Sequence, residues 1–447
     1  MAAKSADRGH GGSTGLETRA FDGLSFEEQK GHLFDVARRA LPLWGWPSSS
    51  PLKLLNITEN ATFKVTSPTG RPPMVMRVHR LDYASRESIS FELEWIEELR
   101  RSTDLSLAAP IAGTDGSYVQ SVATPSMDEV RNVVCFTFAE GRAPTDSTDD
   151  TEGLSGVMAT LGKIPNFITF PFVREAAIMY DYVSGRGSAA SKMSDRDAWL
   201  YSELGRAAAI MRARSVEWLP EHCREAQARI SWDWDATFGM GWNNYYGKHY
   251  WDRGSTLSYG DISTLDRALG VMYKRLEAFG RDPSRYGIVH TDLRMANLLV
   301  DGDKLTILDF DDCGLGWYLF DIAGMVGFME HRGDLNAVID AILSGYEKVW
   351  PLSVDEKQEI PTFILMRRIG LLEALMYHAS NTEPGEGESA EITPDLIAFY
   401  AKGTVALAKR YLKSMKLAPL ARPAGEDASP APPVAGGSGA KPGPVAA

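Results

Sequence analysis

Cysteine is scarce in this sequence, which has only Cys135, Cys223 and Cys313 among its 447 residues. The three lie far apart and show neither a pairing pattern nor the spacing of metal ligands. This argues against a disulfide framework and against a cysteine metal site. A reducing compartment is the simplest interpretation, and we expect a cytoplasmic protein.

Basic clusters and long apolar runs are also missing. No basic run is longer than a pair such as Arg38-Arg39, and 47 basic against 59 acidic side chains give a formal charge of −12. A nucleic-acid binder needs clustered Lys and Arg to contact phosphates, so this class is excluded. No stretch offers the roughly 18 apolar residues of a membrane span, and residues 1–18 lack the apolar centre of a secretory signal. We expect neither a nucleic-acid nor a membrane partner.

Both ends of the chain have the composition of disordered segments. Residues 1–24 are rich in Gly and Ser, and residues 418–447 are rich in Pro, Gly and Ala. Such segments cannot bury a core. The composition as a whole, 44% hydrophobic and 24% charged, is that of a globular protein. The folded part should therefore lie between the two tails.

The pattern of strands and helices changes once along the chain. Ser25 and Glu28 have capping-box spacing and predict a helix that ends at Pro42. Five segments then have strand character, with a charged amphipathic helix over 85–101 between the third and the fourth. The five segments are 52–57, 61–66, 74–79, 117–122 and 132–138. From Gly141 the pattern is mostly helical.

Residues 287–312 carry the most specific chemical signal. An Asp-Gly dipeptide at 301–302 lies between two apolar runs, which predicts a β-hairpin. Asn297 precedes the outgoing strand and Asp309 follows the returning one, so both side chains should emerge at the open end. Asp292, five residues before Asn297, is within reach of the same place. Oxygen ligands of this kind suit Mg²⁺ bound together with substrate phosphates.

A surface hairpin with solvated Asp and Asn is the alternative, because both are common turn residues. That interpretation suits Asp303 in the turn. It does not suit Asp292, Asn297 and Asp309 together, since residue type, spacing and flanking strands would all have to coincide. For His290 a packed or backbone-bonded histidine is the favoured interpretation.

The motif has a recognisable order. The pattern His-x-Asp-Leu-x-x-x-Asn at 290–297, the hairpin, Asp-Phe-Asp at 309–311 and Asp-Ile-Ala at 321–323 resemble the aminoglycoside phosphotransferase and choline kinase family, relatives of the protein kinases. The resemblance implies a bilobal, protein-kinase-like α+β fold. A small antiparallel-sheet N-lobe would span 25–140 and bind the nucleotide, and a large, mainly helical C-lobe would span 141–417.

The resemblance also implies a role for each polar residue of the motif. Asp292 would be the base that orients the acceptor hydroxyl. Asn297 and Asp309 would hold Mg²⁺ against the ATP phosphates, with Asp311 as a second metal contact. Asp321 would brace the catalytic loop.

The residues expected to bind the nucleotide phosphates depart from the usual kinase pattern. In kinase-like folds a cation on the third strand holds the phosphates and pairs with a Glu on the next helix. Arg77 stands in the lysine position, and Glu92 is the expected partner, with Glu94 as its competitor. Arginine keeps the charge but differs from lysine in length and geometry.

Further nucleotide contacts follow from position in the resembled fold. The loop before the second strand has no glycine. Because small-molecule kinases of the resembled family often cover the phosphates with Ser, Thr or Asn side chains, the resemblance implies that Asn60 and Thr62 contact phosphate. Phe138 and Ala139, at the end of the fifth strand, are the expected adenine-contacting hinge. Thr291 stands where many relatives have glycine and should reshape the acceptor end of the catalytic loop.

The expected function is ATP- and Mg²⁺-dependent transfer of the γ-phosphoryl group to a hydroxyl of a small molecule, as in aminoglycoside, choline or homoserine kinases. A protein Ser/Thr kinase of the same fold is one alternative, although Asp-Phe-Gly and Ala-Pro-Glu motifs are missing. A nucleotide-binding pseudokinase is another, which Arg77 and Thr291 leave open. The stretch 145–198 is either a helix packed on the larger lobe or a lid. The acceptor, the oligomeric state and the choice of ATP or GTP stay open.

Overall fold

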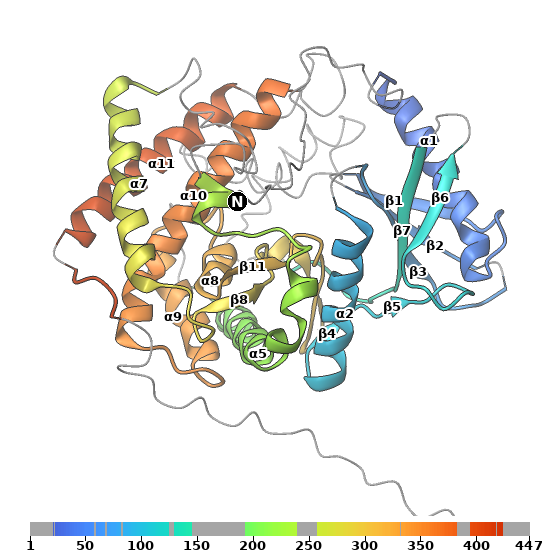
Figure 1. The fold of residues 1–447 in the computed structure, drawn as a ribbon, viewed down its shortest axis with the longest axis horizontal. Coiled ribbons are helices and arrows are strands. Elements are labelled where there is room, and N and C mark those ends of the chain that lie inside the picture. Colours follow the sequence, from blue (N-terminus) through green and yellow to red (C-terminus); the bar gives the residue numbers. More distant parts are fainter. Residues whose placement is uncertain are drawn as a thin grey trace, which may run out of the picture.

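The computed structural model describes residues 21–422, with gaps at 22, 58–59, 68, 82–83, 125–128, 145–192, 239–256, 331, 382–393 and 417. An antiparallel sheet forms its N-terminal part and helices form its C-terminal part (Figure 1). Most of both predicted tails, and nearly all of the stretch 145–198, lie outside the described residues. Within the described residues, no helix combines the length and the apolar character needed to cross a membrane.

The N-terminal helix α1 (Phe26–Ala40) begins and ends as the sequence predicts. The capping box forms, because Glu28 accepts hydrogen bonds from the Ser25 amide at 2.9 Å and the Ser25 hydroxyl at 2.6 Å. A short 3-10 turn, η1 (Leu41–Trp44), follows where Pro42 ends the α-helix. The buried residues Val36 and Ala37 of α1 belong to the apolar cluster that covers one face of the sheet.

The N-terminal sheet has six strands in the order β1-β2-β3-β7-β5, with β6 also paired to β7, and every pair is antiparallel. Its strands are β1 (Leu52–Ile57), β2 (Ala61–Val65), β3 (Met74–Val78), β5 (Pro110–Ile111), β6 (Gln120–Thr124) and β7 (Glu129–Thr137). The five longer strands match the predicted segments within a few residues. The two-residue β5 starts with a proline and has no strand pattern, so the sequence did not predict it.

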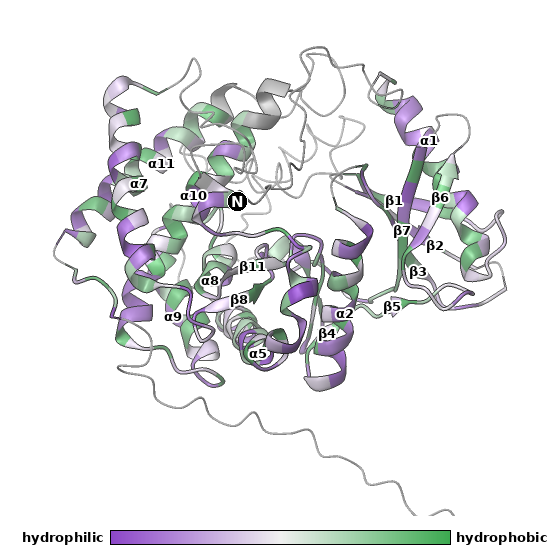
Figure 2. Cartoon of the chain, in the orientation of Figure 1, coloured by the Kyte–Doolittle hydropathy of each residue, from purple (hydrophilic) through white to green (hydrophobic). Residues whose placement is uncertain are grey.

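Helix α2 (Arg86–Ser102) is shared between the two parts of the structure. The Ser85 side chain caps it by accepting from the Ser88 amide at 3.1 Å. Its apolar side contains Phe91 and Trp95, whose rings lie 5.6 Å and 5.3 Å from that of Trp218. In Figure 1, α2 lies between the sheet and α5. Figure 2 shows that α2 carries both hydrophilic and hydrophobic residues. Its apolar side therefore belongs to the core of the C-terminal helices.

The helical part is built around a close pair of helices. Its helices are α5 (Asp195–Ala226), α6 (Trp234–Phe238), α7 (Tyr259–Phe279), α8 (Leu319–Met325), α9 (Leu335–Tyr346), α10 (Val354–Asn381) and α11 (Pro394–Met415). A Cβ on Gly205 of α5 would lie 2.0 Å from the Ile342 carbonyl oxygen, and one on Gly345 of α9 would lie 1.7 Å from the Ser202 carbonyl oxygen. Glycine thus lets the backbones of α5 and α9 touch.

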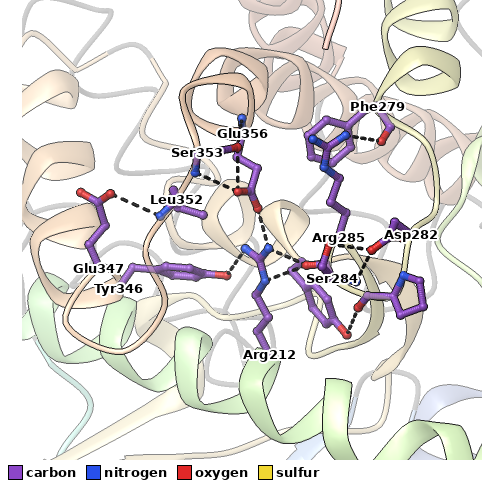
Figure 3. Close-up of polar contacts among 12 residues, drawn as sticks. Arg212, Phe279, Asp282, Ser284, Arg285, Tyr346, Glu347, Leu352, Ser353 and Glu356 are labelled. Atoms are coloured by element: carbon purple, nitrogen blue, oxygen red, sulfur yellow. Dashed lines mark hydrogen bonds and ion pairs between the residues drawn. The ribbon is translucent and has the colours of Figure 1, made fainter. Parts of the chain in front are cut away.

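A buried arginine on α5 ties this helix pair to the strand that enters the candidate site. Arg212 donates to Glu356 Oε1 at 2.5 Å, to the Ser284 carbonyl oxygen at 2.5 Å and to the Tyr346 hydroxyl at 3.2 Å (Figure 3). Ser284 lies just before β8 (Tyr286–Val289). The ion pair with Glu356 therefore fixes the approach to β8 relative to α9 and α10.

Two small sheets support the predicted hairpin. Strand β8 pairs with β11 (Gly314–Trp317), and the hairpin strands β9 (Leu298–Asp301) and β10 (Lys304–Ile307) are joined by β4 (Ser106–Leu107), which runs parallel to β10. The Arg142 amide also donates to the Val300 carbonyl oxygen at 3.0 Å. A strand that follows α2 and a segment that follows β7 are thus both hydrogen-bonded to the hairpin.

The first residues of the predicted C-terminal tail pack on the helices. Arg275 of α7 donates to the carbonyl oxygens of Ala418 at 3.2 Å and Pro419 at 2.9 Å. Ala421 is 6% exposed. Residues 418–422 are therefore docked, and the rest of the predicted tail lies outside the described residues.

We expect Gly345→Ala to lower the free energy of unfolding by about 1–3 kcal/mol, because the added Cβ meets the Ser202 carbonyl and overpacks the contact of α5 with α9. Gly270→Ala is the control. Gly270 is exposed in α7, and nothing lies within 4 Å of its added Cβ. The control should be neutral or stabilising by up to about 1 kcal/mol, through helix propensity. Urea unfolding measures both, and equal effects of the two variants would contradict the close helix contact.

Candidate active site

The loop after β8 is held by a carboxylate from α8. Asp321 is 3% exposed, and its two oxygens accept the amides of His290 at 3.0 Å and Thr291 at 2.6 Å. Burial raises the pKa of Asp321, while His290 and the two amides act in the opposite direction. His290 Nε2 lies 2.9 Å from the Leu308 carbonyl oxygen, and its Nδ1 accepts the Asp292 amide at 3.3 Å. These contacts imply a proton on Nε2, and His290 is backbone-bonded as expected.

Thr291 is in a conformation that its residue type disfavours. Its φ is 74°, in the left-handed region, where a β-branched side chain is strained. The residue is 1% exposed, and its hydroxyl donates to the Asp312 carbonyl oxygen at 3.3 Å. Thr291 therefore connects the loop after β8 to the segment that follows the hairpin.

The hairpin brings Asn297 beside Asp292. Strands β9 and β10 pair in the register Leu298↔Ile307, and the Leu308 amide closes the ladder by donating to the Asn297 carbonyl oxygen at 2.9 Å. The Asn297 side-chain amide donates to Asp292 Oδ2 at 2.7 Å and to its carbonyl oxygen at 2.9 Å. The two residues thus lie together at the open end of the hairpin, as predicted.

Two arginines hold the carboxylate of Asp292. Arg294 Nε donates to Oδ2 at 2.8 Å, and Arg367 Nη2, from α10, donates to Oδ1 at 2.5 Å. Burial acts to raise the pKa of Asp292, but the two guanidinium groups outweigh it and lower that pKa. Asp292 is therefore ionised at neutral pH. Neither arginine was predicted to contact Asp292. Arg294 was within the motif, whereas Arg367 lies 75 residues beyond Asp292 and gave no sequence signal.

Asp309 and Asp311 form a pair of neighbouring carboxyl groups. Asp309 has a φ of 66°, and burial together with the neighbouring Asp311 raises its pKa. It interacts electrostatically with Arg77 and with Asp292, so it belongs to the same group of charges. Asp311 Oδ2 accepts a hydrogen bond from the Asn60 side chain at 2.7 Å. A residue predicted to contact phosphate thus contacts a residue predicted to bind metal.

The donor set fits a hard divalent cation that also binds phosphates. Among the described residues, no three or more His, Cys, Asp and Glu side chains form a metal-binding group. Mg²⁺ usually takes only one or two carboxylates from the protein and completes its shell with waters and phosphates. Asp309 and Asp311 with the amide of Asn297 match that pattern, and the mutual repulsion of the two carboxylates favours a cation.

The expected ion pair of Arg77 with Glu92 is present. Arg77 Nη2 lies 2.6 Å and 2.8 Å from the two Glu92 oxygens, and the side chains are 7% and 1% exposed. Glu94 is exposed and is not the partner. Burial acts to lower the pKa of Arg77, but the surrounding carboxylates, Glu92 first, raise it. Nε of Arg77 has no hydrogen-bond partner among the described residues.

Of the other predicted nucleotide contacts, Thr62 lies beside Arg77, and Phe138 and Ala139 lie beyond the end of β7. Thr62 is directly opposite Arg77 in the β2–β3 register, so the two side chains share a face. Phe138 and Ala139 follow the end of β7, both partly buried. Lys64 Nζ lies 3.6 Å from the centre of the Phe138 ring. This cation–π contact was not predicted.

We expect Glu92→Ala to lower the free energy of unfolding by about 3–5 kcal/mol, because it leaves the buried Arg77 without its counter-charge. Glu94→Ala changes an exposed residue of the same helix and should leave stability close to that of the wild type. Denaturant unfolding of both variants gives the comparison. A Glu92→Ala variant as stable as Glu94→Ala would refute the buried pair.

Solved structures of small-molecule kinases share this architecture. The chain is similar to a microcompartment-associated aminopropanol kinase, with 29% identity, a TM-score of 0.63 and coverage of 85% of this chain and 98% of that one. It is also similar to an amicoumacin kinase solved with AMP-PNP and Ca²⁺, with 16% identity, a TM-score of 0.57 and coverage of 85% and 96%. At that identity the second likeness concerns the fold alone.

Curated relatives match over short segments. A homoserine kinase of Neisseria meningitidis serogroup B is 36% identical over 80 residues, which are 17% of this chain and 26% of that protein. An amicoumacin kinase of Bacillus subtilis is 36% identical over 62 residues, or 14% of this chain and 18% of that protein. An uncharacterised protein of Synechocystis is 40% identical over 58 residues, 13% of this chain and 16% of its own length. Each match covers well under two thirds of the relative.

The family model matches most of the part that the structure describes. The model of the phosphotransferase enzyme family aligns with residues 52–353, from β1 to just before α10. This range includes Arg77, Glu92 and the whole segment from Asp292 to Asp311. The resemblance inferred from the motif is thereby confirmed, and the chain is an enzyme that belongs to the phosphotransferase family.

Proposed function

We propose that this phosphotransferase transfers the γ-phosphoryl group of ATP, with Mg²⁺, to a hydroxyl of a small molecule. A sheet lobe would bind the nucleotide and a helical lobe the acceptor. The observation that carries the proposal is the gathering of Asp292, Asn297 and Asp309 at the open end of the hairpin, within electrostatic reach of Arg77. Positioning and charge neutralisation are what phosphoryl transfer requires of a protein.

Asp292 would orient the acceptor hydroxyl and take its proton. Two donors, Asn297 and Arg294, occupy Oδ2, so Oδ1 is the oxygen that an acceptor can use. Arg367 now donates to Oδ1, and we expect the acceptor hydroxyl to share or take this place. The low pKa of Asp292 suits a residue that orients a hydroxyl in a loose transition state, since little proton transfer is needed before the phosphoryl group moves.

The nucleotide would lie along the face of the sheet that carries Arg77. The guanidinium of Arg77, held by Glu92, would neutralise charge on the phosphates. Asn60 and Thr62 would donate to phosphate oxygens. Phe138, with Ala139 next to it, would contact the adenine.

Asn297, Asp309 and Asp311 would hold the metal ion. These residues would present oxygen ligands to Mg²⁺, which when bound would supply positive charge against the ATP phosphates. The Asn297 amide nitrogen is engaged by Asp292, so its oxygen would be the ligand atom. Asp309 and Asp311 would lose their mutual repulsion on binding the cation, which makes metal and nucleotide binding favour each other.

An amino alcohol is the acceptor class that the comparisons favour. The 29% identical structural relative, covered over 98% of its length, is named for aminopropanol, and one curated relative is named for homoserine. Both compounds carry a hydroxyl and an amine. A protein acceptor, or nucleotide binding without transfer, would appear as a distinct result in the test.

The test measures ADP release from ATP and Mg²⁺ with four classes of acceptor: amino alcohols, hydroxylated amino acids, amino sugars and unstructured Ser/Thr peptides. We expect metal-dependent ADP release with an amino alcohol or hydroxylated amino acid, matched by phosphorylated product in the mass spectrum. Phosphorylated peptides alone would identify a protein kinase. Nucleotide binding without release would identify a pseudokinase, and no binding of any purine nucleotide would contradict the proposal.

We expect Asp292→Asn to lower kcat by on the order of a hundredfold or more while ATP binding persists, because the amide keeps the shape but cannot accept the proton. Asp303→Asn is the matched control, since Asp303 lies in the exposed hairpin turn with its side chain 92% exposed. Its kcat should equal that of the wild type. Turnover of Asp292→Asn close to that of Asp303→Asn would remove Asp292 from the proposed role.

A further inference from the structure

Arg229 has no part in the scheme above, yet it is almost fully buried. It lies in the connection between α5 and α6, and 7% of its surface is exposed. A buried guanidinium has five donors to satisfy, so the groups that accept from it show which parts of the molecule it joins.

One side of the guanidinium holds the turn that follows Asp309. Arg229 Nε donates to the Cys313 carbonyl oxygen at 2.6 Å, and Nη2 donates to the Asp311 carbonyl oxygen. Nη2 also lies 3.5 Å from the Phe310 carbonyl oxygen. All three acceptors are main-chain atoms, so these bonds fix the path of the backbone between the two predicted metal ligands and β11.

The other side holds the first turn of α2. Arg229 Nη1 lies 3.1 Å from the Ser88 hydroxyl and 3.3 Å from its carbonyl oxygen. Ser88 is 6% exposed. Glu92 comes four residues later on the same side of the helix, and it bonds Arg77. The charge of Arg229 also acts directly on Glu92.

The backbone that carries Arg229 is itself fixed. The Leu315 amide donates to the Ile230 carbonyl oxygen at 3.1 Å, and the Trp232 amide donates to the Leu315 carbonyl oxygen at 2.7 Å. This close approach needs Gly314, because a Cβ there would lie 2.2 Å from the Ile230 carbonyl oxygen. Arg229 thus projects from a segment that is already bonded to β11.

We propose that Arg229 is a positioning residue that couples the metal-binding turn at 309–313 to helix α2. Through Ser88, Arg229 fixes the position of Glu92 on α2. Through Glu92, it fixes the position of the Arg77 guanidinium group, which would bind phosphate. One guanidinium would thus keep the metal ligands and the phosphate cation at a fixed separation. This inference rests on the nucleotide and metal roles proposed above.

Arginine is the residue that this geometry requires. Its planar fork can donate in several directions at once, whereas a lysine ammonium is a compact charge on a flexible chain. Arg229→Lys therefore keeps the positive charge but loses the simultaneous hydrogen bonds to the turn at 309–313 and to Ser88. Arg275→Lys is the matched control, because Arg275 is 2% exposed and bonds Glu359, Ala418 and Pro419, none of which has a role in the proposed site.

The experiment titrates the full-length chain with the non-hydrolysable analogue AMP-PNP in the presence of Mg²⁺, followed by calorimetry. We expect Arg229→Lys to raise the Kd by at least about tenfold, because charge-assisted hydrogen bonds to both segments are lost. Arg275→Lys should lower the melting temperature but keep the Kd within about twofold, since a distant site does not couple. Combining Arg229→Lys with Glu92→Gln should raise the Kd by less than the product of the single effects.

An Arg229→Lys variant that loses stability but keeps the wild-type Kd would overturn the coupling and leave Arg229 a structural residue. If that variant does not fold, Ser88→Ala replaces it, because it removes only the hydroxyl contact. Ser88→Ala should raise the Kd by about threefold, and an unchanged Kd would then overturn the proposal. A wild-type chain that binds no AMP-PNP would overturn the proposed function, and this inference with it.

Discussion

The carboxylate of Asp321 is the contact on which the geometry of the site depends. It accepts the amides of His290 and Thr291, and it thereby holds a β-branched residue in a left-handed conformation that is otherwise costly. With the loop fixed, His290 reaches the Leu308 carbonyl oxygen, and the Leu308 amide closes the hairpin on Asn297. The loop that carries Asp292 and the end of the hairpin that carries Asn297 are therefore placed relative to α8, inside the core of the helical part.

Asp292 and Asp309, which this geometry brings together, have different electrostatic surroundings. Asp292 lies between two guanidinium groups that keep it ionised, which suits a carboxylate that orients a hydroxyl by accepting its hydrogen bond. Asp309 lies beside Asp311, and their repulsion is relieved by a cation. Neighbouring carboxyl groups in opposite environments take different roles. The different roles proposed for Asp292 and Asp309 follow from these surroundings, since both side chains are aspartates.

Local patterns predicted the parts of the structure that depend on residues close in sequence. The hairpin followed from an Asp-Gly turn between apolar runs, whereas the pairing of Glu92 with Arg77 was implied by the resemblance to kinase-like folds. Contacts between distant segments left no such pattern. Arg367 reaches Asp292 from α10, and Arg229 reaches two segments from an irregular connection. Their positions are set by contacts between segments far apart in the chain, which single-sequence periodicity does not encode. The membership of α2 in the larger core was missed for the same reason.

Locating a metal ion is the most direct test of the account. Crystals of the full-length chain with AMP-PNP and Mn²⁺ would show the ion by its anomalous scattering. We expect a peak about 2.0–2.3 Å from oxygen atoms of Asn297 and Asp309 and from phosphate oxygens. Asp292 should stand free of the ion, with an oxygen directed to the side from which an acceptor approaches. A peak coordinated by Asp292, or a nucleotide bound away from Arg77, would contradict the account.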